Sequence, residues 1–214
     1  MRKILFTTGE FYHVFNRGVD KRSIMLDMFD ADRFLKSMIV FNTVKQIGSI
    51  YELSFQVDFK PAKKDKLVDI IAYCLNPNHF HLMLKQSRNG GISKFMQKLA
   101  AGYSWYFNHK YKRNGVLFQG PFKIKHINDN SYALHTSAYI NLNDKVHQLG
   151  ASGAKLVRSS WDEYRNSKNE ICKKDIILNQ FNNPVEYTSF ALESLKDMIA
   201  KRDDYRELAA LFKE

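Results

Sequence analysis

The stretch VDIIAYCLNPNHFHLMLK, Val68–Lys85, decides the fold of this chain. Val68–Leu75 is a strongly apolar run of strand length, Asn76-Pro77-Asn78 is a turn signal, and His79–Lys85 is a second, mainly apolar run. Two such runs on either side of a short turn predict a pair of neighbouring antiparallel strands. The other elements are placed outward from this hairpin.

The second strand of the hairpin carries the motif His-Phe-His. Because side chains alternate along a strand, His79 and His81 point to one face, and Phe80 and Leu82 point to the other. Two imidazoles side by side supply half of a metal site, although such pairs also occur on strands that bind no metal. Zinc prefers further Cys, His or carboxylate ligands, but Cys74 lies across the turn and the neighbouring segment lacks acids. A site with so few protein ligands favours Mg²⁺ or Mn²⁺ completed by water and phosphate oxygens.

The remaining elements follow from apolar periodicity and from cap and turn residues. They are a strand over Phe11–Arg17, a helix over Asp30–Val44 capped by Asp27 or Asp30, an exposed turn over Lys60–Lys66, a helix over Ile92–Tyr111, a strand over Val116–Ile127 and a helix over Asp129–Val146. The segment Tyr51–Phe59 is ambiguous and is compatible with a strand. The order β-α-β-β-α-β predicts an α+β fold, a ferredoxin-like sandwich with an antiparallel sheet, helices on one face and a further helix after the last strand.

Composition and charge divide the chain near residue 150. Residues 151–214 hold eleven Lys and Arg and eleven Asp and Glu, so the first 150 residues carry the whole net charge of +11. We therefore expect one domain over residues 1–150 and a C-terminal extension over residues 151–214. The extension contains Trp161, Tyr164 and an amphipathic helix from about Phe190, and it is expected to pack back onto the domain.

The basic character is strongest between Asp69 and Asp129, where no carboxylate occurs. A field of one sign attracts phosphates, and aromatic side chains between the cations can stack on bases. The bland alternative is that the aromatics form the core and the lysines keep the protein soluble. The candidate contacts to nucleic acid in this region are Lys94, Lys98, Tyr103, Lys110, Lys112, Arg113, Lys123 and Lys125.

The chain of 214 residues, 44% apolar, is long enough to bury a core by itself. Its two cysteines, Cys74 and Cys172, form no Cys-x-x-Cys pair, and no signal peptide or apolar run of membrane-spanning length is visible. We therefore expect a cytoplasmic protein with no structural disulfide and no membrane partner.

Four segments resemble one known family. The setting YCLNPNHFHLML resembles the His-hydrophobic-His signature of the HUH single-strand nucleases, in the form found in single-tyrosine transposases of the insertion-sequence-200-like type. The segments FYHVFNRGVDKR, FMQKLAAGYSWYFNHKYKRNGVLFQGPFK and AYINLN are similar to segments of the branch called REP-associated tyrosine transposases, which act at palindromic repeats. The resemblance covers roughly residues 11 to 165.

This resemblance assigns roles to residues after the last predicted strand. In such enzymes the nucleophilic tyrosine opens a Tyr-Ile-x-Leu/Ile-Asn-Pro motif, which here reads Tyr139-Ile140-Asn141-Leu142-Asn143-Asp144. It implies that Tyr139 is the nucleophile and that Asn143, one helical turn later, is a third metal ligand beside His79 and His81. Asp144 departs from the common proline. From the residues alone, a core aromatic on an amphipathic helix is the favoured interpretation of Tyr139, and Tyr132 or Tyr103 is the fallback nucleophile.

The implied activity is nicking and rejoining of single-stranded DNA near hairpins or palindromic repeats, through a 5′-phosphotyrosine link and with Mg²⁺ or Mn²⁺. Asn16 and Arg17, at the end of the first strand, would add phosphate contacts, although they are also typical of a polar turn. Whether the protein is a monomer or a homodimer stays open. The alternatives are a nucleic-acid-binding module that has lost cleavage, and a metal-dependent hydrolase of a small substrate, which the shortage of acids disfavours.

Overall fold

The computed structural model describes residues 5–47, 62–149, 151–166 and 171–211. Its strands are β1 (Phe11–Arg17), β2 (Val68–Asn76), β3 (His79–Gln86), β4 (Lys123–Ile127) and β5 (Arg158–Ser159). Its helices are α1 (Met28–Val40), α3 (Gly91–Lys110), α4 (Asn130–Asn141), α5 (Asn143–Val146), α6 (Ala151–Ala154), α7 (Trp161–Arg165), α8 (Asp175–Leu178) and α9 (Pro184–Leu211). Short 3₁₀ turns lie at Val19–Lys21 and Lys63–Asp65.

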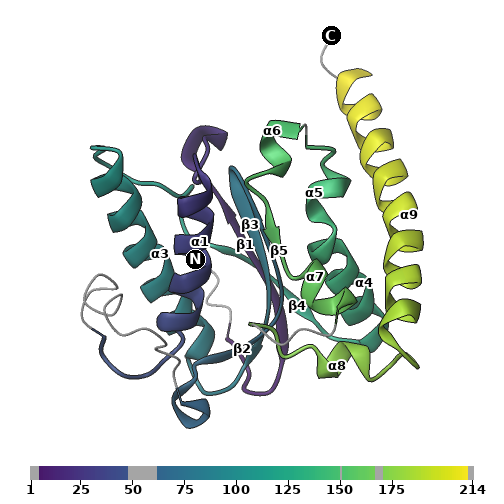
Figure 1. Cartoon of the computed structure of the whole chain (residues 1–214), viewed down its shortest axis with the longest axis horizontal. Coiled ribbons are helices and arrows are strands. Elements are labelled where there is room, and N and C mark those ends of the chain that lie inside the picture. Colours follow the sequence, from purple (N-terminus) through teal and green to yellow (C-terminus); the bar gives the residue numbers. More distant parts are fainter. Residues whose placement is uncertain (1–4, 48–61, 150, 167–170, 212–214) are drawn as a thin grey trace.

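The described strands form one five-stranded sheet in the order β4-β1-β3-β2-β5, and every neighbouring pair is antiparallel (Figure 1). The β2–β3 hairpin closes with Asn76 opposite His79, as the turn signal predicts. The first four strands have the order of a ferredoxin-like sandwich, in which each crossover helix joins strands that are not neighbours in the sheet. The predicted fold class is confirmed.

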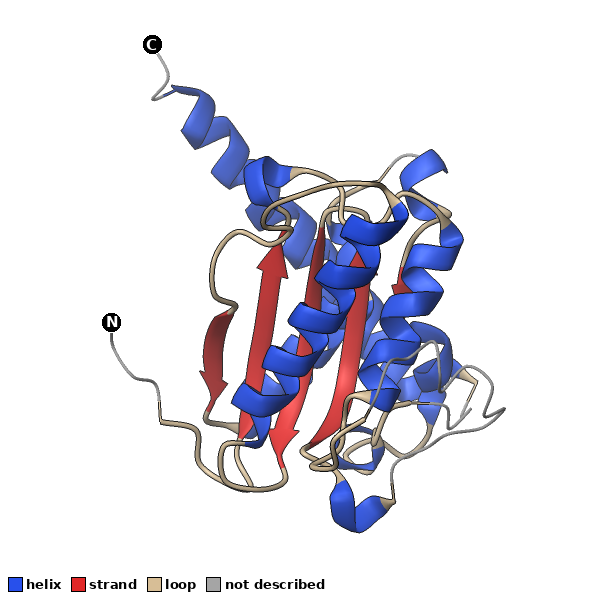
Figure 2. Cartoon of the chain, turned by 90° about the vertical axis from the view of Figure 1, so that its left-hand side faces the viewer, coloured by secondary structure: helices blue, strands red, loops and turns tan. Residues whose placement is uncertain are grey.

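Helices cover both faces of the sheet, whereas the sequence predicted helices on one face only. The crossover helices α1 and α3 lie in front of the strands in Figure 2, and their apolar side chains form one core with Val14, Phe80 and Leu82. On the other face α4 packs on β2, β3 and β4, and α9 packs on α4. This second core contains Met83 and Ile140. The face of β3 that carries His79 and His81 is therefore directed toward α4, the helix that carries Tyr139.

Several element boundaries differ from those that the sequence predicts. The helix predicted over Asp30–Val44 begins at Met28, with Asp27 and Asp30 forming a capping box, and ends at Val40. It ends there because the Asn42 side chain hydrogen-bonds the backbone of Leu67 and Val68 at the start of β2.

The strand predicted over Val116–Ile127 forms only from Lys123. Gly120 adopts a left-handed conformation (φ +67°) next to Pro121, which breaks the extended run. Likewise, the single helix predicted over Asp129–Val146 is divided into α4 and α5 at Leu142 (φ −111°, ψ 18°).

The C-terminal residues extend the core. Within them β5 pairs with β2 along the edge of the sheet. The last helix, predicted from about Phe190, begins at Pro184 and runs beside α4 (Figure 1). The ambiguous segment Tyr51–Phe59 lies outside the described residues. No helix within the described ranges is long and apolar enough to cross a membrane.

Candidate active site

The two histidines of β3 form the floor of the site. His81 is buried and His79 half-buried, and their ring centres lie 5.1 Å apart with perpendicular planes. The intervening Phe80 points into the opposite core. The alternation predicted from the sequence therefore holds, and both imidazoles face α4.

Asn143, the first residue of α5, completes a cluster with His79. Asn143 Oδ1 lies 3.1 Å from His79 Nε2 and accepts a hydrogen bond from Asn76 Nδ2 at 2.7 Å. Asn76 Nδ2 also lies 2.9 Å from His79 Nε2. The break at Leu142 does not separate Asn143 from the site, since the short helix that follows still directs its amide toward β3.

The second nitrogen of His79 is fixed by its neighbour in the turn. His79 Nδ1 lies 2.6 Å from Asn78 Oδ1, a carbonyl oxygen that only accepts. Nδ1 therefore carries the hydrogen, and the lone pair of the neutral ring is on Nε2. In this tautomer Nε2, the nitrogen on the side of Asn143, can bind a metal ion.

Burial keeps the histidines of the site neutral. It lowers the pKa of His79 to about 4, against a weaker opposing effect of Asn143, whose amide oxygen can accept a hydrogen bond only from the protonated ring. Burial likewise lowers the pKa of His81 well below its ordinary value, with the nearby His13, His79 and His147 acting in the same direction. Neutral imidazoles are the form that binds metals.

The spacing and chemistry of these donors fit a small divalent cation. With ligand bonds of about 2.1 Å, two adjacent donors of an octahedral ion lie about 3.0 Å apart, close to the 3.1 Å between His79 Nε2 and Asn143 Oδ1. The set consists of two imidazoles and one amide oxygen. Among the described residues, no group of three or more His, Cys, Asp or Glu side chains is placed to hold a metal.

Tyr139 stands over this cluster from α4. Its ring centre lies 5.5 Å from that of His81, in an edge-on arrangement. Burial raises the pKa of the Tyr139 hydroxyl above 10, while its hydrogen bond with Asn143 acts to lower it. The phenol is therefore protonated near neutral pH and half-buried beside the histidines.

A pocket of about 520 Å³ opens in front of His79, His81 and Tyr139. Three cations line it, namely Arg17, Lys21 and Lys123, and Asn16 contributes to its wall. A second hollow of about 360 Å³ lies on the other side of the Tyr139 ring and is lined by Lys125. Neither lining contains a carboxylate. The pocket therefore has the charge that a phosphodiester requires.

The sequence did not single out some residues of this pocket. His147 packs its ring against His79 at 5.1 Å between centres and lines the pocket. Its only sequence signal is its spacing of four residues from Asn143 and eight from Tyr139. Lys21, Asn78 and Gln119 come from turns, whose placement requires the fold.

The predictions that Tyr103 contacts nucleic acid or serves as a fallback nucleophile are wrong. It is fully buried, and its hydroxyl donates to the carbonyl oxygen of Ile24 at 2.6 Å. Burial raises its pKa strongly. The apolar face that predicted the helix also turns Tyr103 into the core between α3 and the sheet. The other fallback, Tyr132, lines the second hollow.

The basic residues of α3 do not meet the pocket, because α3 covers the opposite face of the sheet. Lys110 donates to both Asp27 and Asp30, and Lys98 donates to the carbonyl oxygens of Thr43 and Lys45. These two amines hold the structure together, contrary to their predicted role. The remaining predicted cations of this region are Lys94 and Lys112, which are exposed, and Arg113, which bonds Asn108.

Comparison with known proteins gives a family match. Residues 42–143 match the family model described as Transposase IS200 like. The matched span contains β2, β3, α3, β4 and α4, and it ends at the candidate ligand Asn143. Among curated proteins none matches this sequence.

A solved structure of a REP-associated tyrosine transposase bound to a REP hairpin is similar over 69% of this chain and 73% of that chain, at 15% identity and a TM-score of 0.44. The family match and the order of strands agree with the resemblance seen in the motifs. Residues 42–143 of this chain are therefore similar to the IS200-like transposase family.

Proposed function

We propose that this protein is a single-strand DNA transposase that nicks and rejoins DNA near palindromic hairpins through a 5′-phosphotyrosine intermediate. We further propose that it belongs to the REP-associated branch, whose motifs it resembles. The observation that carries the proposal is that Tyr139, His79 and His81 line one cationic pocket, with the buried amide oxygen of Asn143 beside His79.

In the proposed reaction the Tyr139 hydroxyl oxygen attacks the phosphorus of a DNA phosphodiester. The phosphorus–O3′ bond breaks, the phenol proton is lost, and the leaving 3′-oxygen takes up a proton. The product is a phosphotyrosine link to the 5′ end and a free 3′-hydroxyl. Since the link retains the phosphate ester, a second 3′-hydroxyl can attack it and rejoin the strand without ATP.

The chain's own residues prepare this attack. Arg17, Lys21 and Lys123 neutralise phosphates on either side of the reacting group, and the absence of carboxylates from the lining removes repulsion. Asn143 acts against the burial that raises the pKa of Tyr139. The ring contact with His81 fixes the direction in which the phenol points.

His79, His81 and Asn143 would hold Mg²⁺ or Mn²⁺. Bound there, the ion supplies positive charge to a non-bridging phosphate oxygen and to the leaving oxygen. The supporting observations are the neutral state of the imidazoles and the 3.1 Å separation of Nε2 and Oδ1.

The test is covalent capture. The protein is incubated with labelled single-stranded hairpin DNA from its own genome, with and without Mn²⁺, and separated by denaturing electrophoresis. We expect a Mn²⁺-dependent band shifted by the 25.0 kDa of the chain. The Tyr139→Phe variant should bind the hairpin but give no such band.

The matched control is Tyr132→Phe, which removes the hydroxyl of the fallback nucleophile and should leave the adduct in place. Adduct formation by Tyr139→Phe would refute the assignment of the nucleophile. Tight hairpin binding with no adduct from the wild-type protein would leave a non-catalytic nucleic-acid-binding protein on the same fold.

A further inference from the structure

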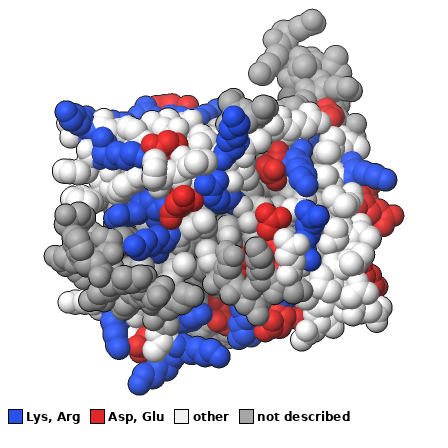
Figure 3. Space-filling view, in the orientation of Figure 1, with Lys and Arg blue, Asp and Glu red and all other residues white. Residues whose placement is uncertain are grey.

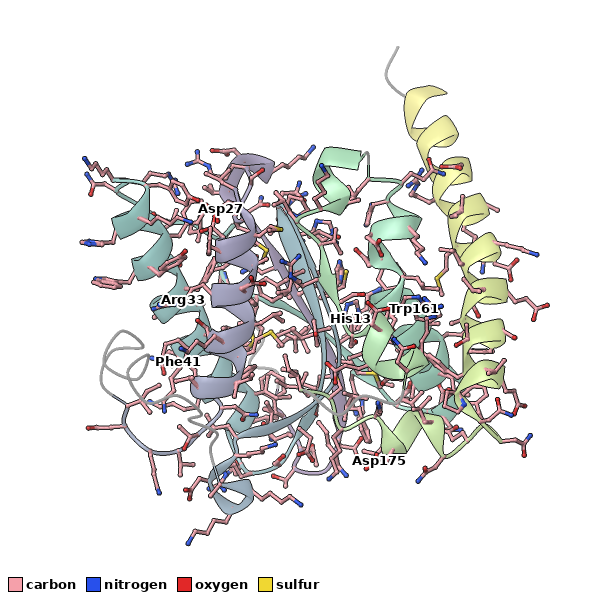
Figure 4. The ribbon with its side chains drawn as sticks, viewed as in Figure 1. His13, Asp27, Arg33, Phe41, Trp161 and Asp175 are labelled. Atoms are coloured by element: carbon pink, nitrogen blue, oxygen red, sulfur yellow. The ribbon has the colours of Figure 1, made fainter. Side chains whose placement is uncertain are left out.

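One buried imidazole beside the site has no part in the proposed reaction. His13 lies on β1, 7% exposed, between the sheet and the helices of the α4 side (Figure 4). Its Nε2 lies 2.8 Å from Nδ1 of His81, and its ring centre lies 6.0 Å from that of Tyr139. The strand register produces this contact, because β1 places Phe15 opposite His81 and so places His13 one diagonal step away.

The contact couples the tautomer of His81 to that of His13. A hydrogen bond between two neutral imidazoles needs one donor and one acceptor. If His81 presents a lone pair at Nε2, its Nδ1 carries the hydrogen, and His13 Nε2 must accept it. The opposite tautomer would place a hydrogen on His81 Nε2 and prevent it from ligating.

We propose that His13 is a positioning residue that holds His81 in the tautomer and ring orientation that bind the divalent cation. This inference rests on the proposed function and adds to it the residue that prepares one of the ligands. His13 does not touch the DNA or the ion; it acts through His81.

The other histidine of the pair is oriented by the same kind of group. His79 Nδ1 meets Asn78 Oδ1 at 2.6 Å, so each histidine has a neutral partner on Nδ1. Carboxylates commonly fill this role in metal sites, yet neither hollow beside these rings is lined by one. Neutral acceptors orient the ligands without adding negative charge where a phosphate must enter.

The experiment measures Mn²⁺ binding by the full chain without DNA, from the signal of free Mn²⁺ in electron paramagnetic resonance. His13→Phe keeps an aromatic ring but removes the acceptor, and should weaken Mn²⁺ binding by about 10-fold to 100-fold. His13→Gln restores a side-chain acceptor of similar reach and should recover most of the affinity. The matched control is His126→Phe on β4, an exposed histidine paired with Glu10, which should bind Mn²⁺ like the wild type.

A second measurement needs no substitution and covers the case in which His13→Phe does not fold. Nitrogen-15 correlation spectra of the histidine side chains in the wild-type protein, with Mg²⁺, distinguish the two tautomers. We expect His81 and His13 both to carry hydrogen on Nδ1. Hydrogen on Nε2 of His81 would overturn the inference.

Equal Mn²⁺ affinity of His13→Phe and the wild type would also overturn it. Equal weakening of Mn²⁺ binding by His13→Phe and His13→Gln would overturn the inference as well, since it would indicate only a packing requirement at this position. These failures differ from failure of the proposed function, which is the absence of the Tyr139 adduct in the wild type. A wild type that forms the adduct, with a His13→Phe variant that binds Mn²⁺ normally, refutes only the role of His13.

Discussion

The hydroxyl of Tyr103 donates to the Ile24 carbonyl oxygen at 2.6 Å inside the core formed by α3 and the sheet. A buried carbonyl oxygen that loses its hydrogen-bond donor is left unsatisfied, so the free-energy cost of its desolvation is no longer offset. Tyr103→Phe should therefore lower the free energy of unfolding by about 1 kcal/mol, measured by urea denaturation. Since the side chain is fully buried, hairpin affinity should not change.

The matched control for this prediction is Arg17→Ala at the rim of the pocket, which should weaken hairpin binding with little effect on stability. A Tyr103→Phe variant with normal stability and weakened DNA binding would contradict the buried position of this residue.

Individual site residues differ in how far the sequence could predict them. Strand alternation was enough to place His79 and His81 on one face. Asn143 and Tyr139 needed the resemblance to a family, because an aromatic on an amphipathic helix is otherwise most simply a core residue. His13 could not be predicted, since its contact with His81 depends on the register between β1 and β3, strands 68 positions apart at this contact.

At the scale of elements, α4 is held in place by a buried polar network. Asn141 Nδ2 donates to the Tyr187 hydroxyl of α9 at 2.8 Å, and Asn141 Oδ1 accepts from Ser160 Oγ. Ser160 Oγ in turn accepts from the Tyr73 backbone nitrogen of β2. The network thus joins α9, α4 and the sheet two residues from Tyr139, and it fixes the helix that presents the proposed nucleophile.

Tyr187→Phe should break this connection. The substitution leaves Asn141 Nδ2 buried without its acceptor, which costs about 1 to 3 kcal/mol in the free energy of unfolding. We expect lower stability in urea and faster hydrogen exchange of the α4 backbone amides, which report local opening.

The control for Tyr187→Phe is Thr188→Ala on the same helix, whose hydroxyl donates to the Pro184 carbonyl oxygen one turn earlier. It should change neither stability nor exchange in α4 by a comparable amount. Normal α4 protection in Tyr187→Phe would show that apolar packing of α9 alone holds the helix.

The elements that the sequence predicted well are those with strong local signals. Phe11–Arg17 is bounded as predicted, and each strand of the β2–β3 hairpin is one residue longer at its C-terminal end than predicted. Predictions were less accurate where a distant contact decides the boundary, as Asn42 does for α1. They were also less accurate at Leu142, where no glycine or proline marks the break between α4 and α5.

At the scale of the whole molecule, the fold decides how much of the net charge of +11 is engaged in ion pairs within the structure. The segment without carboxylates meets acids from elsewhere, as Lys110 does with Asp27 and Asp30. Burial opposes the charge of Lys110, but these hydrogen bonds outweigh it and raise its pKa. On the face seen in Figure 3 both signs are interspersed. Of the cations in this segment, Lys123 and Lys125 line the two hollows, whereas Lys98 and Lys110 are engaged in hydrogen bonds within the structure.

This distribution predicts how DNA binding responds to salt. For single strands, the slope of log affinity against log salt concentration is about −0.7 for each phosphate neutralised. Removing one cation that contacts a phosphate should reduce the slope by about 0.7. We therefore expect Lys123→Ala to bind hairpin DNA more weakly and with a shallower slope, because Lys123 lines the main pocket. Fluorescence anisotropy in a salt series measures both quantities.

The matched control is Lys196→Ala, which removes an exposed lysine from α9 in the charge-balanced C-terminal part of the chain. Both variants lose one positive charge, so a purely long-range effect of net charge would shift them equally. We expect only Lys123→Ala to change the slope, because counterions are released where a phosphate is contacted and not in proportion to net charge. Equal shifts would mean that the pocket holds no phosphate at Lys123, and the path of the strand would then have to be sought on another face of the molecule.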